Sequence, residues 1–380
     1  MSPIDLDHNA TTRPRDEVLA AMDLAWRTAY GNPGSRHALG RPARQILEDS
    51  REQIAAILNA RPTEVVFTSG GTEATNLALH GLTAGPCGMI ALPPGEHPAT
   101  EEMLRALQLR GWRRTEIPLG PDGLFVTDRL ASLPWTDFRL ATALLAHNET
   151  GVIQDIAPLA AHCREHRIPL HIDAVQAVGK IDVDFHKLGA TTLALAAHKF
   201  HGPRGIGALL IRDGLHLAPL LFGGHQESGR RPGTECAPLA TGMATALQIW
   251  HNSRAESTRQ ITELREQLLA GLSAHCAPIV VHGDPRHRLP NTLSVAFPGC
   301  DGDALLVALD LEGVCCSLGS TCASGSSEPA PILVAMGIPR DVIRSTLRLT
   351  LGIDNSPAEI HSAIQAFARV VPRLRSNSAR

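Results

Sequence analysis

Apolar and polar residues alternate in blocks between residues 50 and 250, and the blocks have two lengths. Short apolar runs typical of strands are followed by longer stretches with the apolar spacing of helices. The runs that predict strands are 64–69, 89–94, 140–147, 168–174, 191–198 and 206–212, and those that predict helices are 70–82, 98–111 and 156–167. Because the strands are continuously apolar, they favour a parallel sheet buried on both faces. The order of elements predicts an α/β fold with a mainly parallel sheet.

The pattern changes near residue 250. Residues 249–275 predict one long helix, and strand-like segments follow at 291–297 and 347–352 with helices between them. We therefore expect a large α/β domain over 15–250. A smaller α+β domain is expected from 1–14 and 251–380, joined to the first through the long helix.

Composition narrows the classes of function. The chain has 380 residues, 43% of them hydrophobic, and a formal net charge of −3. There is no basic run of the kind that binds nucleic acid or an anionic membrane. The first residues lack the charged and apolar regions of a signal peptide, and no apolar stretch approaches the ~20 residues that span a bilayer. These features predict a cytoplasmic protein.

The cysteines argue for free thiols. They are scattered through the chain, at positions 87, 163, 236, 276, 300, 315, 316 and 322, and form no C-x-x-C pair. A disulfide framework and a structural zinc site are therefore not expected. One of the thiols could be reactive.

Polar residues stand where predicted strands end, which is where open α/β sheets bind ligands. Lys199 follows the apolar run 191–197. Lysine is rarely buried without a partner, so Lys199 is either a surface residue or is held in a pocket for chemistry. Asp173 ends the strand at 168–174, where a carboxylate needs a cationic partner, although a helix-capping role stays open.

A turn rich in small residues, TSGGTEATN at 68–76, separates a strand from a helix. Backbone N–H groups around Gly70, Gly71 and Thr72 could cradle a phosphate at the helix N-terminus. The alternative is ordinary capping by Thr72 or Ser69. Taken alone, His97 and Asn148 at other strand ends indicate only a capping residue and a turn residue.

Together these residues indicate a particular cofactor. Pyridoxal phosphate needs a lysine for the Schiff base, a carboxylate for the pyridine nitrogen and a phosphate site. Lys199, Asp173 and the turn at 68–76 supply these three groups. His97 could then stack on the ring, and Gln176 could touch its phenolic oxygen.

The sequence resembles the class V aminotransferase superfamily and, within it, the NifS-type (class I) cysteine desulfurases. The resemblance spans nearly the whole chain. The motifs that carry it are DHNATT (7–12), GNPGSRH (31–37), FTSGGTEATN (67–76), EH (96–97), NETGVIQDI (148–156), DAVQAVGK (173–180), HKFHGPRGIGAL (198–209), RPGTE (231–235), SLGSTCASGSSEP (317–329) and LRLTLG (347–352). It implies the type I pyridoxal-phosphate-dependent transferase fold.

The resemblance also implies roles for the cofactor-binding residues. Lys199 matches the Schiff-base lysine, and His97 matches the histidine that stacks on the ring and assists proton transfer. Asp173 matches the partner of the pyridine nitrogen, and Gln176 matches the residue near O3′.

Further positions match phosphate and substrate ligands. Gly71, Thr72 and His198 match the phosphate site, and Thr234 matches a threonine that reaches the phosphate of the neighbouring subunit, which implies a homodimer. Asn148 and Arg348 match the residues that hold the substrate carboxylate, and a guanidinium is well suited to bind it bidentately.

Cys322 matches the nucleophilic cysteine that receives sulfur as a persulfide. Its segment, near 317–329, contains small and polar residues, which favours a mobile, accessible loop. An incidental surface cysteine is the alternative. Cys315 and Cys316 follow an apolar stretch and are expected to be buried and structural.

Two departures from the family pattern are visible. Ala196 stands where the family usually has a phosphate-binding serine, a loss of about 1 kcal/mol unless water or His201 substitutes. Proline precedes Gly233 where serine is usual.

The resemblance implies conversion of L-cysteine to L-alanine, with sulfur passed from Cys322 to an acceptor such as an iron–sulfur scaffold or a tRNA-thiolation protein. A selenocysteine lyase or another reaction on the same cofactor is the alternative, as is a cofactor-binding scaffold without turnover. His162 and His166, four residues apart, resemble a zinc motif, but a solvated helix face is the better interpretation. No metal is expected.

Overall fold

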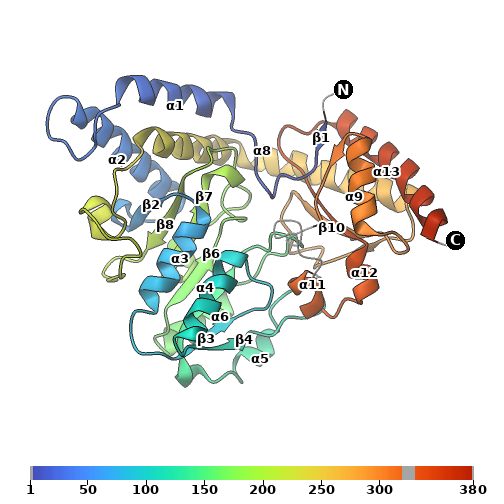
Figure 1. The fold of residues 1–380 in the computed structure, drawn as a ribbon, viewed down its shortest axis with the longest axis horizontal. Coiled ribbons are helices and arrows are strands. Elements are labelled where there is room, and N and C mark those ends of the chain that lie inside the picture. Colours follow the sequence, from blue (N-terminus) through green and yellow to red (C-terminus); the bar gives the residue numbers. More distant parts are fainter. Residues whose placement is uncertain (1–2, 319–329, 379–380) are drawn as a thin grey trace.

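A seven-stranded sheet forms the centre of the larger part of the molecule (Figure 1). The computed structural model describes residues 3–318 and 330–378. The strand order is β2-β8-β7-β6-β5-β3-β4. The strands are β2 (Val65–Thr68), β3 (Met89–Leu92), β4 (Arg113–Glu116), β5 (Phe138–Leu144), β6 (Leu170–Asp173), β7 (Thr192–Ala196) and β8 (Gly207–Ile211).

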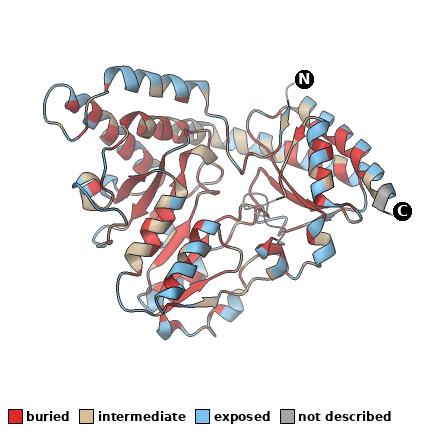
Figure 2. Ribbon diagram, in the orientation of Figure 1, coloured by how far each residue is buried: buried red, intermediate tan, exposed pale blue. Residues whose placement is uncertain are grey.

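Helices cover both faces of this sheet, as the buried residues in Figure 2 indicate. On β7, Leu193 and Leu195 belong to the hydrophobic cluster that includes residues of α2, α6 and α8, whereas Ala194 belongs to a cluster with α3. Adjacent strand residues point to opposite faces, so both faces are apolar. The helices of this part are α1 (Asp16–Thr28), α2 (Gly40–Ile57), α3 (Gly71–Leu82), α4 (Pro98–Leu109), α5 (Thr127–Leu130), α6 (Ala157–Glu165) and α7 (Phe185–Leu188).

The expectation of a mainly parallel sheet is confirmed, with one exception. Strand β8 runs antiparallel to both β2 and β7. The connection from β7 to β8 is short and contains no crossover helix, and a parallel pair requires such a crossover. Strand β4 was not predicted because its residues are polar and it lies at the sheet edge.

A second group of elements surrounds two small sheets. One pairs β1 (Ile4–Asp5) with β11 (Val314–Cys315), and the other has the order β12-β10-β9. The remaining strands are β9 (Val280–Val281), β10 (Thr292–Ala296) and β12 (Thr346–Thr350), and the helices are α9 (Gly302–Leu311), α11 (Pro331–Ala335), α12 (Arg340–Arg344) and α13 (Pro357–Ser378).

Helix α8 (Ala237–His275) connects the two parts. We predicted its second half but not its start, which lies twelve residues before 249 and carries Pro238 in its first turn. Residues near its start, including Met243 and Leu247, belong to the core around the large sheet, whereas Leu264 and Leu268 belong to the core around β10 and β12. The boundary placed at residue 250 therefore falls within a continuous helix and stays a prediction.

Among the described residues, no helix is long and apolar enough to cross a membrane.

A buried ion pair fixes the loop before α8 to the large sheet. The Arg51 guanidinium on α2 donates to both carboxylate oxygens of Glu227, each at 2.8 Å, and also to the carbonyl of Val65 at 2.6 Å. The backbone N–H of Phe67 donates to the same carboxylate at 3.1 Å. The pair thus joins a helix, a strand and a loop.

We expect Glu227→Ala to lower the free energy of unfolding by about 3 kcal/mol, because it leaves the buried Arg51 with only the partly exposed Glu48 as an ionic partner in the described part of the chain. Urea denaturation measures the change. The double variant Arg51→Met/Glu227→Leu should recover most of the loss, and Arg259→Ala, which breaks an exposed pair with Glu256, serves as the surface control. A loss no larger than that of the control would contradict the prediction.

Candidate active site

A pocket at the carboxyl ends of the parallel strands brings together most of the residues predicted from the sequence. The cavity has a volume of about 230 Å³. The pocket is lined by Gly71, Thr72, His97, Leu144, Asn148, Asp173, Val175, Gln176, Ala196, His198 and Lys199. The residues come from five separate strand ends, which meet here because those strands run in the same direction.

Lys199 lies in the turn that follows β7, half-buried. Its ammonium donates to the carbonyls of Asn9 at 2.7 Å and Ala10 at 2.8 Å. Burial and the positive charge of Arg348 lower the pKa of Lys199 to about 8, against 10.5 for an ordinary lysine, while Asp173 opposes the shift. The amine is therefore partly neutral near physiological pH and can act as a nucleophile or base.

Asp173 ends β6 and is 3% exposed. One carboxylate oxygen accepts the N–H of Val175 at 2.9 Å, which is a turn contact and not a helix cap. Burial raises the pKa of Asp173, and the charges of His97 and Lys199 oppose that shift. A carboxylate in this position is stabilised by a cation in the pocket.

His97 caps α4 and also faces the pocket. Its Nδ1 accepts the N–H of Ala99 at 3.1 Å, so the capping role expected from the sequence is confirmed. Burial lowers the pKa of His97. The ring is therefore neutral at pH 7, and because Nδ1 is an acceptor, its proton is on Nε2.

The start of α3 forms one end of the pocket. Its N-cap is Gly70, and no side chain caps the helix, so the capping alternative for Thr72 and Ser69 is wrong. A Cβ on Gly71 would lie 2.7 Å from Val175 Cγ2, so only glycine permits this close packing. The uncapped helix N-terminus favours an anion.

His198 and Ala196 lie across from this helix start. Burial and the charge of Lys199 lower the pKa of His198 to about 4, and its Nδ1 is 3.2 Å from Thr11 Oγ1. Ala196 presents a methyl group to the pocket, so this position offers no hydroxyl to a phosphate. His201 does not substitute for that hydroxyl, because it lines a different cavity and its Nδ1 donates to the carbonyl of Arg13.

Arg348 on β12 does not line the pocket but contacts Asn148, which does. Its guanidinium donates to Asp7 Oδ1 at 2.7 Å and to the carbonyl of Asn148 at 3.3 Å. Its buried Nε has no hydrogen-bond partner within the described chain. The side chain is thus held beside Asn148 with one buried donor unused.

Thr234 and the three cysteines discussed above complete the predicted residues. Thr234 is exposed and does not line the pocket. Cys322 lies outside the described residues. Cys315 and Cys316 are half-buried, so the expectation that they are buried is wrong, because β11 is an edge strand of a two-stranded sheet. The described cysteines are all free, as expected.

Sequence reasoning missed Asp7, Asn9 and Lys180. Asp7 pairs with Arg348, and Asn9 and Lys180 contact the predicted site residues directly. The first two belong to the DHNATT motif and Lys180 ends DAVQAVGK, so the motifs marked the segments without indicating what the side chains do.

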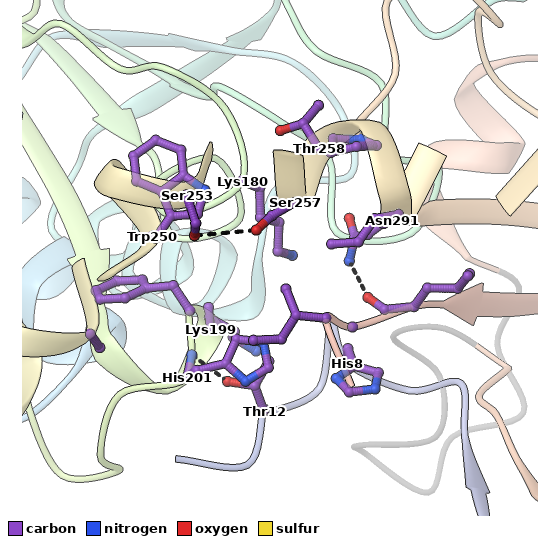
Figure 3. Close-up of a pocket in the computed structure, with 18 of the residues that line it drawn as sticks. His8, Thr12, Lys180, Lys199, His201, Trp250, Ser253, Ser257, Thr258 and Asn291 are labelled. Carbon is purple, nitrogen blue, oxygen red and sulfur yellow. Dashed lines mark hydrogen bonds between the residues drawn. The ribbon is translucent and has the colours of Figure 1, made fainter. Parts of the chain in front are cut away.

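A second cavity lies on the other side of Lys199 (Figure 3). Its walls include Lys180, His201 and Asn291, together with Trp250 and Ser257 of α8. Lys199 therefore forms part of the wall between two cavities. Within the described residues that line this cavity, no carboxylate is present.

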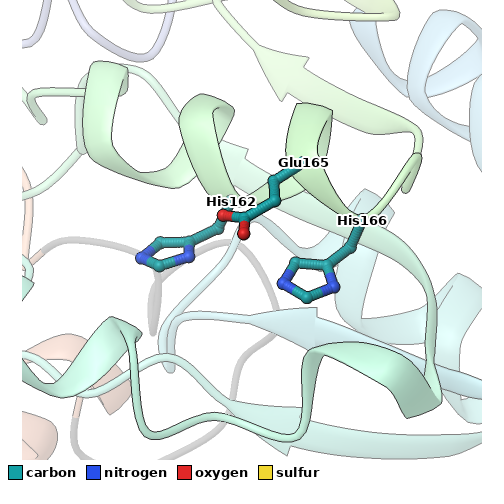
Figure 4. A group of neighbouring side chains, drawn as sticks. All are labelled: His162, Glu165 and His166. Carbon is teal, nitrogen blue, oxygen red and sulfur yellow. The ribbon is translucent and has the colours of Figure 1, made fainter.

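His162 and His166 lie close to Glu165 on α6, as Figure 4 shows. Glu165 and His166 are exposed, as expected for a solvated helix face, but both imidazoles also stack on Trp135. This group is separate from the pocket.

Comparisons with known proteins agree with this arrangement. The family model for aminotransferase class-V matches residues 4–362. A cysteine desulfurase IscS of Dictyoglomus turgidum is 36% identical over 98% of this chain and 95% of its own length. An IscS-like cysteine desulfurase of Mycobacterium tuberculosis is 38% identical over 97% and 96%. A solved structure of a NifS-like protein matches with a TM-score of 0.92 and 32% identity, over 98% of this chain and 100% of that one.

The chain belongs to the aminotransferase class-V family, whose fold is the type I architecture expected from the sequence. Within that family, the chain is similar over its full length to NifS-type cysteine desulfurases. The resemblance predicted from the motifs is therefore confirmed.

The lowered pKa of Lys199 gives a pH prediction. The chain has three lysines, so labelling of each by trinitrobenzenesulfonate can be followed by peptide mass spectrometry. Only a neutral amine reacts, so labelling of Lys199 in cofactor-free protein should reach half its maximal rate near pH 8 rather than near 10.5.

Two variants test the cause of that shift. Arg348→Met should move the midpoint to higher pH because it removes a positive charge, and Asp173→Asn should move it to lower pH because it removes a negative one. The exposed Lys187 is the internal reference. A Lys199 midpoint that neither variant moves would show that these charges do not set its pKa.

Proposed function

We propose that the protein is a pyridoxal-phosphate-dependent cysteine desulfurase that converts L-cysteine to L-alanine and carries the sulfur on Cys322. The observation that supports it most strongly is the single pocket that contains Lys199, Asp173, His97 and the start of α3. Each of these groups matches one requirement of the cofactor. Full-length similarity to cysteine desulfurases supports the choice of substrate.

The pocket fits pyridoxal phosphate. The uncapped N-terminus of α3, with Gly71 packed against Val175, offers backbone N–H groups to a phosphate. Asp173 lies at the end of β6 with a buried carboxylate that a protonated ring nitrogen would stabilise. Lys199, Gln176 and His198 would contact the rest of the cofactor, with His97 placed to stack on the ring.

When bound, the cofactor would supply a carbonyl carbon that condenses with amines and a ring that delocalises negative charge from the substrate Cα. Lys199 would move the Cα proton, since its Nζ is partly neutral at physiological pH. His97 would donate a hydrogen bond from Nε2 while Nδ1 is held by the α4 backbone. In this neutral form the imidazole would orient the group that it contacts, and Lys199 would carry the proton.

Arg348 and Asn148 would bind the substrate carboxylate. The buried Nε of Arg348 has no partner within the described chain, and a substrate carboxylate would supply one through a charge-assisted contact that orients the amino acid. Asp7 already holds the Nη2 of Arg348 at 2.7 Å, which keeps the side chain extended toward the pocket before substrate arrives.

Cys322 would attack the substrate sulfur as a thiolate. A sulfur–sulfur bond forms and the carbon–sulfur bond breaks, leaving a persulfide on the enzyme. The carbon retains the bonding electron pair and takes up a proton to become the methyl group of alanine. An external thiol or an acceptor protein then removes the terminal sulfur.

We also propose an oligomeric state, an acceptor for the sulfur and a cellular location. The exposed Thr234 would reach the phosphate site of a second subunit in a homodimer. The proposal extends to an iron–sulfur scaffold as acceptor of the sulfur and to a cytoplasmic location, both as predicted from the sequence.

The test is to incubate the wild type, Cys322→Ala and Lys199→Ala with L-cysteine and a reductant and to quantify alanine and sulfide together. The wild type should give equal amounts of both, and each variant should lose more than a hundredfold of that activity. Cys236→Ala, a substitution at a half-buried cysteine outside the pocket, is the matched control. Undiminished turnover by Cys322→Ala would indicate a lyase that releases sulfur without a protein persulfide.

A further inference from the structure

Asn9 is a buried residue at the centre of the contacts between the pocket and the small sheets. It lies in the segment after β1, is 1% exposed, and its backbone N–H, carbonyl, Oδ1 and Nδ2 all form hydrogen bonds. An asparagine with every polar group satisfied has one allowed position, so its neighbours are fixed relative to one another.

One set of contacts goes to predicted site residues. The Asn9 carbonyl accepts from Lys199 Nζ at 2.7 Å and from Gln176 Nε2 at 3.0 Å. Its Nδ2 donates to the carbonyl of Asn148 at 3.0 Å. Because that carbonyl can only accept, the orientation of the Asn9 amide is determined.

The other set goes to the β10–β12 sheet. The Asn9 N–H donates to Thr350 Oγ1 and its Nδ2 to Thr292 Oγ1, both at 3.0 Å. Asn291 Nδ2 donates to Asn9 Oδ1 at 3.0 Å. Asn9 therefore connects strands β10 and β12 to Asn148 after β5 and to Lys199 after β7. Strand β12 also carries Arg348.

Lys180 completes the network. Its ammonium donates to Asn9 Oδ1 at 2.6 Å and to Gln176 Oε1 at 2.5 Å. Lys180, Lys199 and Asn291 all line the second cavity (Figure 3). Burial, together with the charges of Lys199 and Arg348, lowers the pKa of Lys180 well below its usual value. Lys180 thus holds the Gln176 amide from behind the pocket.

We propose that Asn9 is a positioning residue, which holds Lys199, Gln176 and Asn148 in register with Arg348 through its contacts with Lys180 and the β10–β12 sheet. This inference rests on the proposed function, because the positioned groups are those that would hold the cofactor and substrate.

The test compares Asn9→Ala with Asn355→Ala in the holoenzyme. Asn355 is also a buried asparagine, 4% exposed, and bonds backbone groups of Gly352 and Asp5, but it contacts no pocket residue. Both variants should unfold at lower temperature. We expect only Asn9→Ala to reduce the visible circular dichroism of the bound cofactor per unit absorbance by at least half, and kcat by at least tenfold.

The outcomes separate this inference from the proposed function. A wild type without a visible cofactor band would refute the proposed function. A wild type with that band, and an Asn9→Ala variant whose dichroism and kcat match those of Asn355→Ala, would overturn the positioning role alone. If Asn9→Ala does not fold, Lys180→Met tests the same network, since it removes the donor shared by Asn9 and Gln176, and it should reduce the dichroism likewise.

A different observation concerns the surface of α6. Two histidines one helical turn apart and the carboxylate of Glu165 have ligand atoms that all lie within 4.8 Å of one another. In Figure 4 the Glu165 carboxylate lies between the two imidazoles. Two imidazoles and a carboxylate form a ligand set that Zn²⁺ accepts.

Trp135 holds both imidazoles in place. The His162 ring stacks on it with centroids 4.8 Å apart and an interplanar angle of 9°, and the His166 ring with values of 6.0 Å and 15°. The indole itself is 5% exposed and its Nε1 donates to the carbonyl of Leu130 at 2.7 Å. Both rings therefore lie nearly parallel to a buried indole that supports them, which lowers the entropy lost when they bind an ion.

We infer that His162, Glu165 and His166 form a surface site for a transition-metal ion of the zinc or nickel class, with water completing the coordination. Calorimetric titration of chelator-treated holoenzyme with Zn²⁺ alone should detect one micromolar site that is lost in His162→Ala and in His166→Ala. Glu165→Gln should weaken it about tenfold.

His275→Ala, at an exposed histidine near the end of α8, is the matched control and should retain the site. Zinc bound by free thiols elsewhere would persist in every variant and is thereby distinguished. The inference is overturned if the α6 variants bind Zn²⁺ with the stoichiometry and affinity of the wild type.

Discussion

The arrangement of the pocket depends on the burial of one amine. Lys199 is half-buried at the end of β7, and its ammonium donates to the backbone carbonyls of Asn9 and Ala10. Carbonyls satisfy the donors without neutralising the charge, so desolvation and the nearby Arg348 still favour the neutral amine. A carboxylate in their place would have raised the pKa instead. The backbone of the first ten residues thus affects the protonation of Lys199, which is far away in sequence.

Much of the pocket's electrostatic character follows from burial. His97 and His198 both have lowered pKa values, and burial is the largest cause for each. Asp173 is displaced in the opposite direction for the same reason. A cavity whose bases are neutral and whose carboxylate needs a cation is prepared for a ligand that carries both an anionic group and a protonated ring. The pocket is therefore lined by polar residues, and its buried carboxylate would be stabilised by a cation.

Hydrophobic pattern predicted six strands of the large sheet and helices α3, α4 and α6, because each is a continuous apolar run or a regular helical repeat, but helices α1 and α2 were not predicted. It could not predict β4, whose exposed residues carry no apolar signal, or the direction of β8, which depends on the length of a connection. The pocket residues were found because each follows an apolar strand, and the family motifs linked them. Asn9 and Lys180 were missed because their importance lies in contacts between segments more than a hundred residues apart, which local pattern does not encode.

Helix α8 contributes side chains to two hydrophobic cores, with Met243 and Leu247 in one and Leu264 and Leu268 in the other. Helix formation is cooperative, so unfolding of α8 at one end destabilises the rest of the helix. Loss of either core therefore weakens the packing of α8 in the other. The two parts therefore share one melting event more readily than two domains joined by a flexible linker would. A cofactor bound among residues of the large sheet would protect from unfolding, and hence from proteolysis, the C-terminal core that shares helix α8 with that sheet.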